Sequence, residues 1–283
     1  MDISPHLPAA DIAGELNRCL RQCGTVVVTA PPGAGKSTVL PLTMLEGLAE
    51  DAGKIIMLEP RRIAARQIAG RMASLLGEEV GETVGYRIRY ENRTGRRTRI
   101  EVVTEGILSR MLVADPGLEG VSIVIFDEFH ERNLQTDLAL ALARETQSVL
   151  RPDLKLVLMS ATIDAGELCT ALGARKVSCE GRLYPVEIRY EGDTSPDNMV
   201  EAVLRTIRKA LAAYAGDILA FLPGEGEIRR CAEALGDALG GTRVFPLYGM
   251  LPLEEQHRAI VPSRPGERKV VLATPIAETS LTI

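Results

Sequence analysis

Short apolar runs alternate with longer amphipathic segments in the first part of the chain. The runs are rich in Val, Ile and Leu, which is typical of strands buried on both faces of a parallel sheet. The longer segments carry apolar residues at helical spacing, as Ile12, Leu16 and Leu20 do. This alternation predicts an α/β fold with a mainly parallel sheet and helices on both faces. The expected strands are 26–28, 54–59, 83–90, 98–103, 121–126 and 154–159, and the expected helices are 8–23, 37–50, 63–76, a segment opening at 104–106, and 134–150.

The pattern pauses at 180–185, where we place a linker between two domains, 1–180 and 181–283. An amphipathic helix is predicted at 197–214, because its apolar residues share one helical face. Strand and helix then alternate again, which predicts a second α/β domain of the same kind. The remaining expected strands are 218–222, 243–247 and 269–274, and the remaining expected helices are 225–239 and 253–260.

The composition limits the class of protein. Hydrophobic residues make up 46% and charged residues 25% of the chain, as in ordinary globular proteins. No apolar run approaches the roughly 20 residues that span a bilayer, and the N-terminus lacks the basic and apolar regions of a signal peptide. The 5 cysteines are scattered, which favours reduced thiols over disulfides or zinc. We therefore expect a cytoplasmic protein without a membrane partner.

The net charge of −5 means that nucleic acid could be bound only through local basic patches. Aromatic residues are few and Trp is absent, which argues against base-stacking platforms as the main binding mode.

The strongest chemical signal is the segment 25–37, with the sequence TVVVTAPPGAGKS. A valine run is followed by a glycine-rich turn and the start of a helix, the arrangement in which backbone N–H groups surround a phosphate chain. Lys36 would add a charge for the β- and γ-phosphates, and the Ser37 hydroxyl could bind Mg²⁺. The alternative is a strand-to-helix turn that binds nothing. The residues expected to hold the nucleotide here are Pro32, Gly33, Ala34, Gly35, Lys36, Ser37 and Thr38.

A pair of acids, Asp127 and Glu128, directly follows the apolar strand 121–126. We expect Asp127 to hold Mg²⁺ through water and Glu128 to orient the attacking water, since phosphoryl transfer depends on positioning and charge stabilisation. The alternative is a strand that simply ends in solvated acids. His130 lies two residues further on, and we expect it to bond toward Ser160 or Thr162 rather than to a metal.

These polar groups share one predicted location. Lys36, Asp127, Glu128 and Thr162 each follow a predicted strand. The carboxyl ends of parallel strands form the edge where open α/β sheets bind ligands, so we expect them along one rim.

Arginines are concentrated before the Asp-Glu strand in an otherwise acidic chain. Arginine at strand ends suits the phosphates of a nucleic-acid backbone, which position a strand without specifying its sequence. The alternative is a solvated charged hairpin with a polar turn at 92–95. These arginines are Arg61, Arg62, Arg87, Arg89, Arg93, Arg96, Arg97 and Arg99.

The motifs together resemble a known family. The ordered blocks are APPGAGKS, LEPRRIAAR, VVTEGIL, DEFH, SAT, FLPGEGEI, PLYGMLP and ATPIAETSLTI. They resemble superfamily 2 helicases, within them the DEAH-box group, and most closely its bacterial HrpB-type members. The resemblance covers essentially the whole chain. It implies two RecA-like domains, the second incomplete, with ATP or another nucleoside triphosphate and Mg²⁺ between them and single-stranded RNA, or an RNA duplex with an overhang, across both.

The resemblance also assigns roles by position. It implies that Ser160 and Thr162 couple hydrolysis to strand movement and that Arg71 packs on the nucleotide base. The resemblance and the arginine pattern together also imply a set of nucleic-acid-binding residues. These are Arg61, Arg62, Arg89, Thr104, Glu105, Gly106, Gly249 and Thr274.

Several positions depart from the family pattern. Ala30 replaces the usual first glycine of the phosphate loop, and Phe129 replaces Ala in D-E-A-H, but neither change removes a catalytic group. Pro275 stands where Asn is frequent, and Ile260 lies where an aromatic often packs on the base. The block that supplies arginine fingers is not in the sequence, so we expect a fragment that binds nucleotide and hydrolyses it weakly.

Two other functions remain open at this point. The same motifs would serve an ATP-gated RNA clamp or a ribonucleoprotein remodeller that separates no strands. A motor on single-stranded DNA is the less favoured alternative to the RNA helicase.

Overall fold

The computed structural model describes residues 7–161, 165–180, 185–192, 195, 198–236, 241–264 and 266–275. The chain divides into two compact units, Met1–Tyr184 and Pro185–Ile283. Each unit has its own sheet and its own apolar core, so each is described by itself.

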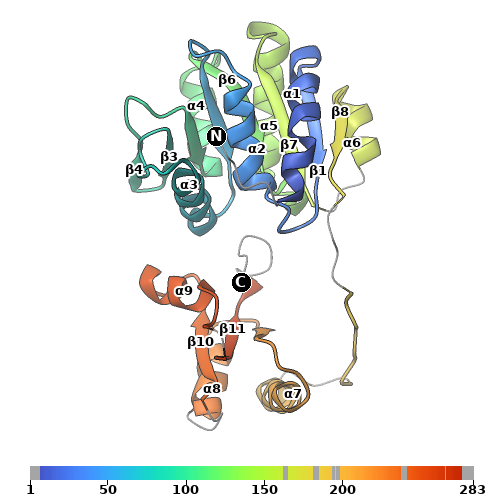
Figure 1. The fold of residues 1–283 in the computed structure, drawn as a ribbon, viewed down its shortest axis with the longest axis vertical. Helices are drawn as coiled ribbons and strands as arrows, with labels where there is room; N and C mark the ends of the chain where they lie inside the picture. The colour runs from blue at the N-terminus through green and yellow to red at the C-terminus, as the bar shows by residue number, and fades with distance from the viewer. Residues whose placement is uncertain are drawn as a thin grey trace. The chain divides into compact units, whose positions relative to one another are not determined.

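The first unit is built on an 8-stranded sheet with the order β4-β3-β5-β2-β6-β7-β1-β8 (Figure 1). All neighbours pair in parallel except β4, which runs antiparallel to β3. The strands are β1 (Thr25–Thr29), β2 (Lys54–Leu58), β3 (Val84–Ile88), β4 (Glu91–Arg93), β5 (Ile100–Val103), β6 (Val121–Phe126), β7 (Lys155–Ser160) and β8 (Arg175–Ser178).

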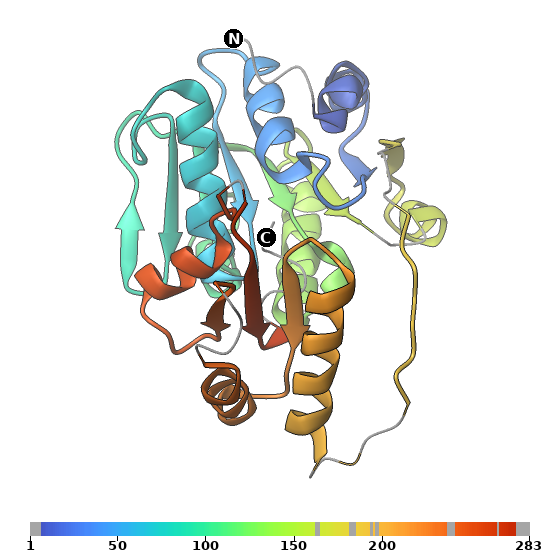
Figure 2. The same ribbon diagram turned by 60° about the horizontal axis from the view of Figure 1, so that its bottom comes forward.

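Helices cover both faces of this sheet (Figure 2). One face packs against η1 (Pro8–Ile12), α1 (Ala13–Gln22), α2 (Lys36–Glu46) and α3 (Arg62–Leu76). The other packs against α4 (Glu105–Ala114), α5 (Leu134–Glu145) and α6 (Ala165–Leu172). The valine run of β1 shows why the sequence suits this position: Val26 and Val28 enter one core, Val27 enters the other, and all are fully buried.

The second unit has a 3-stranded parallel sheet with the order β10-β11-β9. The apolar face of α7 contributes Leu204 and Ile207 to its core. Its elements are α7 (Met199–Ala213), β9 (Ile218–Phe221), α8 (Glu225–Leu235), β10 (Arg243–Leu247), α9 (Leu253–Ile260) and β11 (Lys269–Ala273).

The α/β fold with mainly parallel sheets is confirmed. Four elements have no counterpart in the predicted set, namely β4, the 3-10 helix η2 (Phe129–Glu131), α6 and β8. The helix predicted to reach Leu150 ends as an α-helix at Glu145, and a π-helical segment, Thr146–Leu150, follows it. Thr162 and residues 181–184 of the predicted linker lie outside the described residues. In the part of the chain that the structure describes, no helix is both long and apolar enough to cross a membrane.

The predicted polar turn at 92–95 is wrong in its position. Asn92 and Arg93 belong to strand β4, and the chain reverses earlier, at Arg89 and Tyr90. The register pairs Ile88 with Glu91, which leaves a two-residue connection. Tyr90 adopts a φ of 68° there. Glycine or asparagine usually marks such a turn, and neither occupies positions 89 and 90, so no local pattern predicts it.

Candidate functional site

The polar groups predicted to share a rim follow neighbouring strands of the first sheet. Strand β7 lies between β6 and β1, and its Val157 pairs with Ile125 on one side and Val26 on the other. The segments that follow β1 and β6 therefore flank the end of β7, and the order of these three strands can be followed in Figure 1.

The glycine-rich loop has the backbone conformation that its sequence predicts. Gly33 and Gly35 have positive φ values of 75° and 88°. A Cβ on Gly35 would also lie 2.9 Å from the side chain of Leu7, so only glycine fits without strain. Ala30 lies outside the left-handed region, and its N–H donates to the carbonyl of Ser160 at 3.1 Å. Alanine therefore fits where the first glycine is usual.

Lys36 begins α2 and is the cation of the site. It is only 6% exposed. Its Nζ donates to a carboxylate oxygen of Glu128 and lies 3.9 Å from Oδ1 of Asp127. Burial alone would lower the pKa of Lys36, but the charges of Asp127 and Glu128 outweigh it and raise the pKa. Lys36 is therefore held charged at the end of the glycine-rich loop, with Ser37 and Thr38 following in the first turn of α2.

Asp127 is completely buried. Its N–H donates to the carbonyl of Leu58, and its Oδ1 accepts the N–H of Glu128 at 2.9 Å. Its Oδ2 is buried without a hydrogen-bond partner among the described residues. Buried carboxylate oxygens are rarely left unpaired, so this atom is suited to a ligand that the protein does not itself supply, such as a cation or its water.

Glu128 has a strained backbone, with φ 50° and ψ 36°. Non-glycine residues in this region are uncommon and tend to occur at functional sites. Burial raises the pKa of Glu128 to about 7, Asp127 adds to the effect, and Lys36 opposes it. Lys36 therefore favours the ionised form of this carboxylate against the effects of burial and of Asp127.

His130 connects the acids with the segment after β7. Its Nε2 lies 3.3 Å from Oε2 of Glu128, and its Nδ1 accepts the N–H of Ala161 at 3.5 Å. Burial and the charge of Lys36 lower the pKa of His130. A neutral ring that accepts at Nδ1 carries its proton on Nε2, which can donate to Glu128. The described contact is thus with Ala161, which lies between the two partners expected for His130.

Two acids of this region were missed by the sequence analysis. Glu59, at the end of β2, is 1% exposed and accepts the N–H of Arg61 at 3.1 Å. Burial, reinforced by Asp127, raises the pKa of Glu59 well above its usual range. Glu131 pairs with the guanidinium of Arg61 at 3.3 Å. Glu59 could have been found, because it ends a buried strand just as Asp127 does.

Except for Arg89, the residues expected to bind nucleic acid from the first unit lie at the beginnings of α3 and α4. Arg61 precedes α3, and Arg62 is its exposed first residue. Thr104 precedes α4, and Glu105 begins it, where its carboxylate accepts the hydroxyl of Thr136 at 3.2 Å. Gly106 is exposed, and its carbonyl accepts Nε of Arg110 at 2.7 Å.

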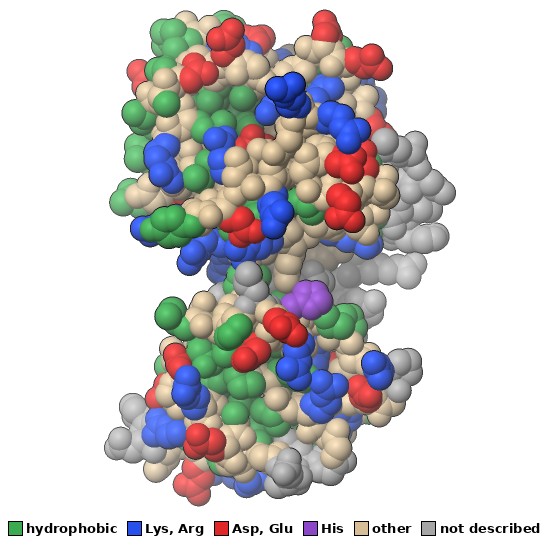
Figure 3. Space-filling view, turned by 90° about the vertical axis from the view of Figure 1, so that its left-hand side faces the viewer, with side chains coloured by type: hydrophobic (Ala, Val, Ile, Leu, Met, Phe, Trp, Pro, Cys, Tyr) green, Lys and Arg blue, Asp and Glu red, His purple; other side chains and the backbone are tan. Residues whose placement is uncertain are grey.

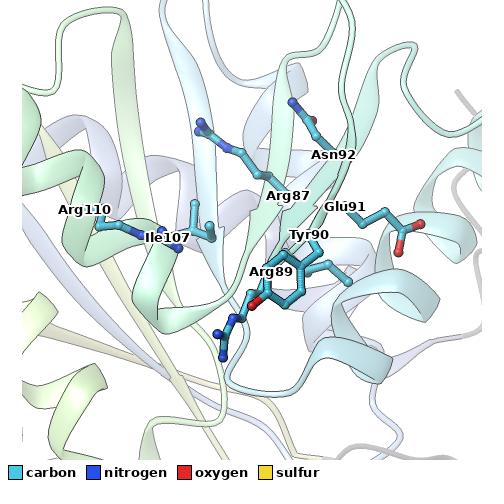
Figure 4. A pocket seen from close by; sticks show the side chains of 8 residues that line it. Arg87, Arg89, Tyr90, Glu91, Asn92, Ile107 and Arg110 are labelled. Carbon is cyan, nitrogen blue, oxygen red and sulfur yellow. The ribbon is translucent and has the colours of Figure 1, made fainter.

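Arg89 is further along the same face, in a basic pocket of about 550 Å³. Figure 3 shows Lys and Arg side chains on the face of the first unit that carries β3 and β4. Arg87, Arg89 and Arg110 line the pocket, together with the exposed ring of Tyr90 (Figure 4). The guanidinium of Arg89 lies 4.7 Å from the centre of that ring.

The remaining predicted residues are Arg71 in the first unit and Gly249 and Thr274 in the second. Arg71 is exposed on α3. Gly249 and Thr274 follow the paired strands β10 and β11 of the second unit, so they share an edge of its sheet. The N–H of Thr274 donates to the carbonyl of Leu247 at 3.1 Å.

Comparison with known proteins gives consistent results. Residues 15–169 match the family model described as DEAD/DEAH box helicase. The chain is 52% identical, over 98% of its length, to the ATP-dependent RNA helicase HrpB of Escherichia coli, of which it covers 34%. It is 38% identical to the pre-mRNA-splicing factor ATP-dependent RNA helicase prp22 of Schizosaccharomyces pombe, covering 98% of this chain and 24% of that protein.

A solved structure agrees with these matches. The crystal structure of the Escherichia coli DEAH/RHA helicase HrpB superposes with a TM-score of 0.90 at 52% identity, over 98% of this chain and 36% of that one. The chain thus spans about a third or less of the length of these relatives.

Proposed function

Because the chain belongs to the DEAD/DEAH box helicase family, we propose that it is the nucleotide-hydrolysing part of an ATP-dependent RNA helicase or translocase. The observation that carries the proposal is the buried group of Lys36, Asp127 and Glu128 beside the glycine-rich loop. A cation facing two acids is what a magnesium–triphosphate complex requires. Two of the relatives are ATP-dependent RNA helicases by name, which supports RNA as the polymer.

In this proposal the loop residues 32–38 surround the phosphates, and Lys36 exchanges its bond with Glu128 for the β- and γ-phosphates. That exchange frees Glu128 to orient the attacking water. His130 holds the other carboxylate oxygen of Glu128 and contacts Ala161, which suits a role in coupling hydrolysis to the segment containing Ser160 and Thr162. Arg71 would pack on the base.

Magnesium fits the residues present. The candidate ligands are the Ser37 hydroxyl and, through water, the unpaired Oδ2 of Asp127, both oxygen donors as Mg²⁺ prefers. No group of three or more His, Cys, Asp or Glu suited to a metal occurs in the described part of the chain. This agrees with a magnesium ion held mainly by the nucleotide and water. The bound ion would neutralise phosphate charge during transfer.

RNA would be bound through its backbone. The exposed side chains of Arg62 and Arg89 and the helix starts at Thr104–Gly106 suit phosphate contacts, which position a strand without base recognition. We propose that Gly249 and Thr274 make the corresponding contacts from the second unit, and that the two units act as the RecA-like domains of a motor. An ATP-gated RNA clamp uses the same groups and remains the second candidate, with a DNA motor third.

The test is ATP hydrolysis with and without RNA, measured on a protein extended to the length of the relatives. The proposal predicts stimulation by single-stranded RNA, and loss of turnover in Glu128→Gln with nucleotide binding retained. Wild-type turnover in Glu128→Gln would overturn the assigned chemistry. Displacement of a strand from a duplex with an overhang separates the motor from the clamp, and the ratio of RNA to DNA stimulation tests the third candidate.

A further inference from the structure

The turn between β3 and β4 holds an exposed aromatic residue in an unfavourable conformation. Tyr90 has a φ of 68° and is 87% exposed. A bulky residue with positive φ is a genuine outlier, and such strain persists only where the surroundings enforce it. Burial of the Tyr90 ring does not enforce it, because the ring lies in solvent.

The next residue, Glu91, pairs with Ile88 across the turn, and both of its carboxylate oxygens accept hydrogen bonds. Oε1 accepts the hydroxyl of Tyr86 at 2.5 Å, and Oε2 accepts Nη2 of Arg66. Tyr86 is a buried residue of β3, and Arg66 belongs to α3, which packs on that strand. One carboxylate therefore joins three elements directly after the strained residue.

The groups that this anchor orients all face the basic pocket. Arg89 and Tyr90 lie side by side at the tip of the turn, whereas Glu91 points away from them (Figure 4). Arg87 forms an ion pair with Glu101 at 2.7 Å, whereas the guanidinium of Arg110 donates to the backbone carbonyl of Gly106. The pocket thus presents a fixed guanidinium stacked on a ring, beside a second cation.

We propose that Glu91 is a positioning residue for nucleic-acid binding, which fixes the Arg89–Tyr90 turn against α3 so that the turn meets a backbone phosphate already in place. The proposal rests on the RNA-binding function proposed above. It explains why the chain maintains strain at an exposed tip: an ordered binding group loses less conformational entropy when its ligand arrives. The lowered pKa of Glu91, caused first by the bond from Tyr86, keeps the anchor ionised.

The first measurement is the affinity of this chain for a fluorescein-labelled single-stranded oligouridine, from fluorescence anisotropy. Glu91→Ala is expected to weaken it about five- to tenfold, as loss of a charge-assisted anchor would. The matched control is Glu82→Ala, which removes another carboxylate paired with an arginine, the exposed Arg97, at 2.9 Å. The control should stay within about twofold, as expected for an exposed pair, and the affinity of both variants for fluorescent ADP should be unchanged.

A second measurement separates positioning from general support of the fold. In an Arg89→Ala/Tyr90→Ala background, Glu91→Ala should have almost no further effect, since a residue that acts only through the turn has nothing left to position. A further loss of the same size in that background would overturn the proposal. If Glu91→Ala fails to fold, Glu91→Gln replaces it, because glutamine keeps one acceptor oxygen and the side-chain size. Its affinity for the oligonucleotide should fall about two- to threefold.

The outcomes distinguish the two proposals. RNA binding by the wild type that weakens in Arg89→Ala but not in Glu91→Ala overturns the positioning role and leaves the proposed function intact. Failure of the wild type to bind the oligonucleotide overturns both.

Discussion

Two parts of the first unit use charged residues in opposite ways. At the carboxyl end of the first sheet, Lys36 is buried between Asp127 and Glu128 and pairs with both, while Oδ2 of Asp127 has no hydrogen-bond partner among the described residues. At the Arg89–Tyr90 turn the guanidinium and the ring are exposed, and the hydrogen bonds are accepted by the carboxylate of Glu91, the next residue. Buried charges are costly unless they are paired. A ligand that draws Lys36 away from the acids must therefore itself be charged. The second arrangement presents an already ordered guanidinium and ring to a polymer that binds from solvent.

The largest effect is expected from removing the buried cation. Lys36→Ala should weaken the binding of a fluorescent ATP analogue about 100-fold, because it deletes a charge-assisted contact and leaves two acids to repel the phosphates. Titration of the analogue measures it. Lys54→Ala is the control, since Lys54 begins β2 and so lies at the amino end of the strand, away from the carboxyl ends that carry the site. Equal losses of affinity in both variants would contradict the assigned site.

A second test concerns the loop backbone. Gly35→Ala should lower the free energy of unfolding by about 1–2 kcal/mol, since alanine must adopt the left-handed conformation of Gly35 and meets Leu7. Urea denaturation measures it. Gly70→Ala is the matched control, because Gly70 lies inside α3 with open space around it, and this change should stabilise by ~0.5–1 kcal/mol. A stable Gly35→Ala protein would show that the loop geometry is not required.

The magnesium assignment predicts a somewhat smaller effect. Asp127→Asn should weaken nucleotide binding about tenfold in the presence of Mg²⁺ and reduce the further loss of affinity caused by EDTA, because the amide supplies no charge to the ion. The wild type should lose a similar factor when Mg²⁺ is removed. If the variant keeps the full magnesium dependence, another residue holds the ion.

The smallest effect is expected at the exposed turn. Tyr90→Gly should raise the free energy of unfolding by ~0.5 kcal/mol, since glycine relieves the positive φ but adds freedom to the unfolded chain. RNA affinity should nevertheless fall, because the ring that orders Arg89 is lost. Denaturation measures the gain in stability and fluorescence anisotropy the loss of RNA affinity. A Tyr90→Gly variant that binds RNA more tightly would show that the ring does not prepare the turn for binding.

The same contrast explains what could be predicted from the sequence. The candidate nucleotide site could be predicted because phosphate and magnesium binding require particular residue types at particular spacings. Here these are the glycines before Lys36 and the acids directly after a buried strand. The parallel α/β fold follows from equally local patterns, and β6, β10 and α9 have the bounds that were expected. Glu59 lay within reach of the same logic.

The turn could not be predicted, because nothing local to Arg89 and Tyr90 specifies it. Its position depends on Arg66, a residue of a separate helix, and on Tyr86 across the hairpin. Strand β8 was missed for a related reason, since its exposed residues Arg175, Lys176 and Ser178 leave only Val177 buried. Polar edge strands are stabilised by pairing with a neighbour, here β1, rather than by their own apolar pattern.

The most direct test of the nucleotide site is a crystal structure of this chain with a non-hydrolysable ATP analogue and Mg²⁺. We predict that the triphosphate lies in the loop at residues 32–38, with Nζ of Lys36 turned from Glu128 to the phosphates and the ion bound to the Ser37 hydroxyl. A nucleotide bound elsewhere, with the Lys36–Glu128 pair still in place, would contradict the account.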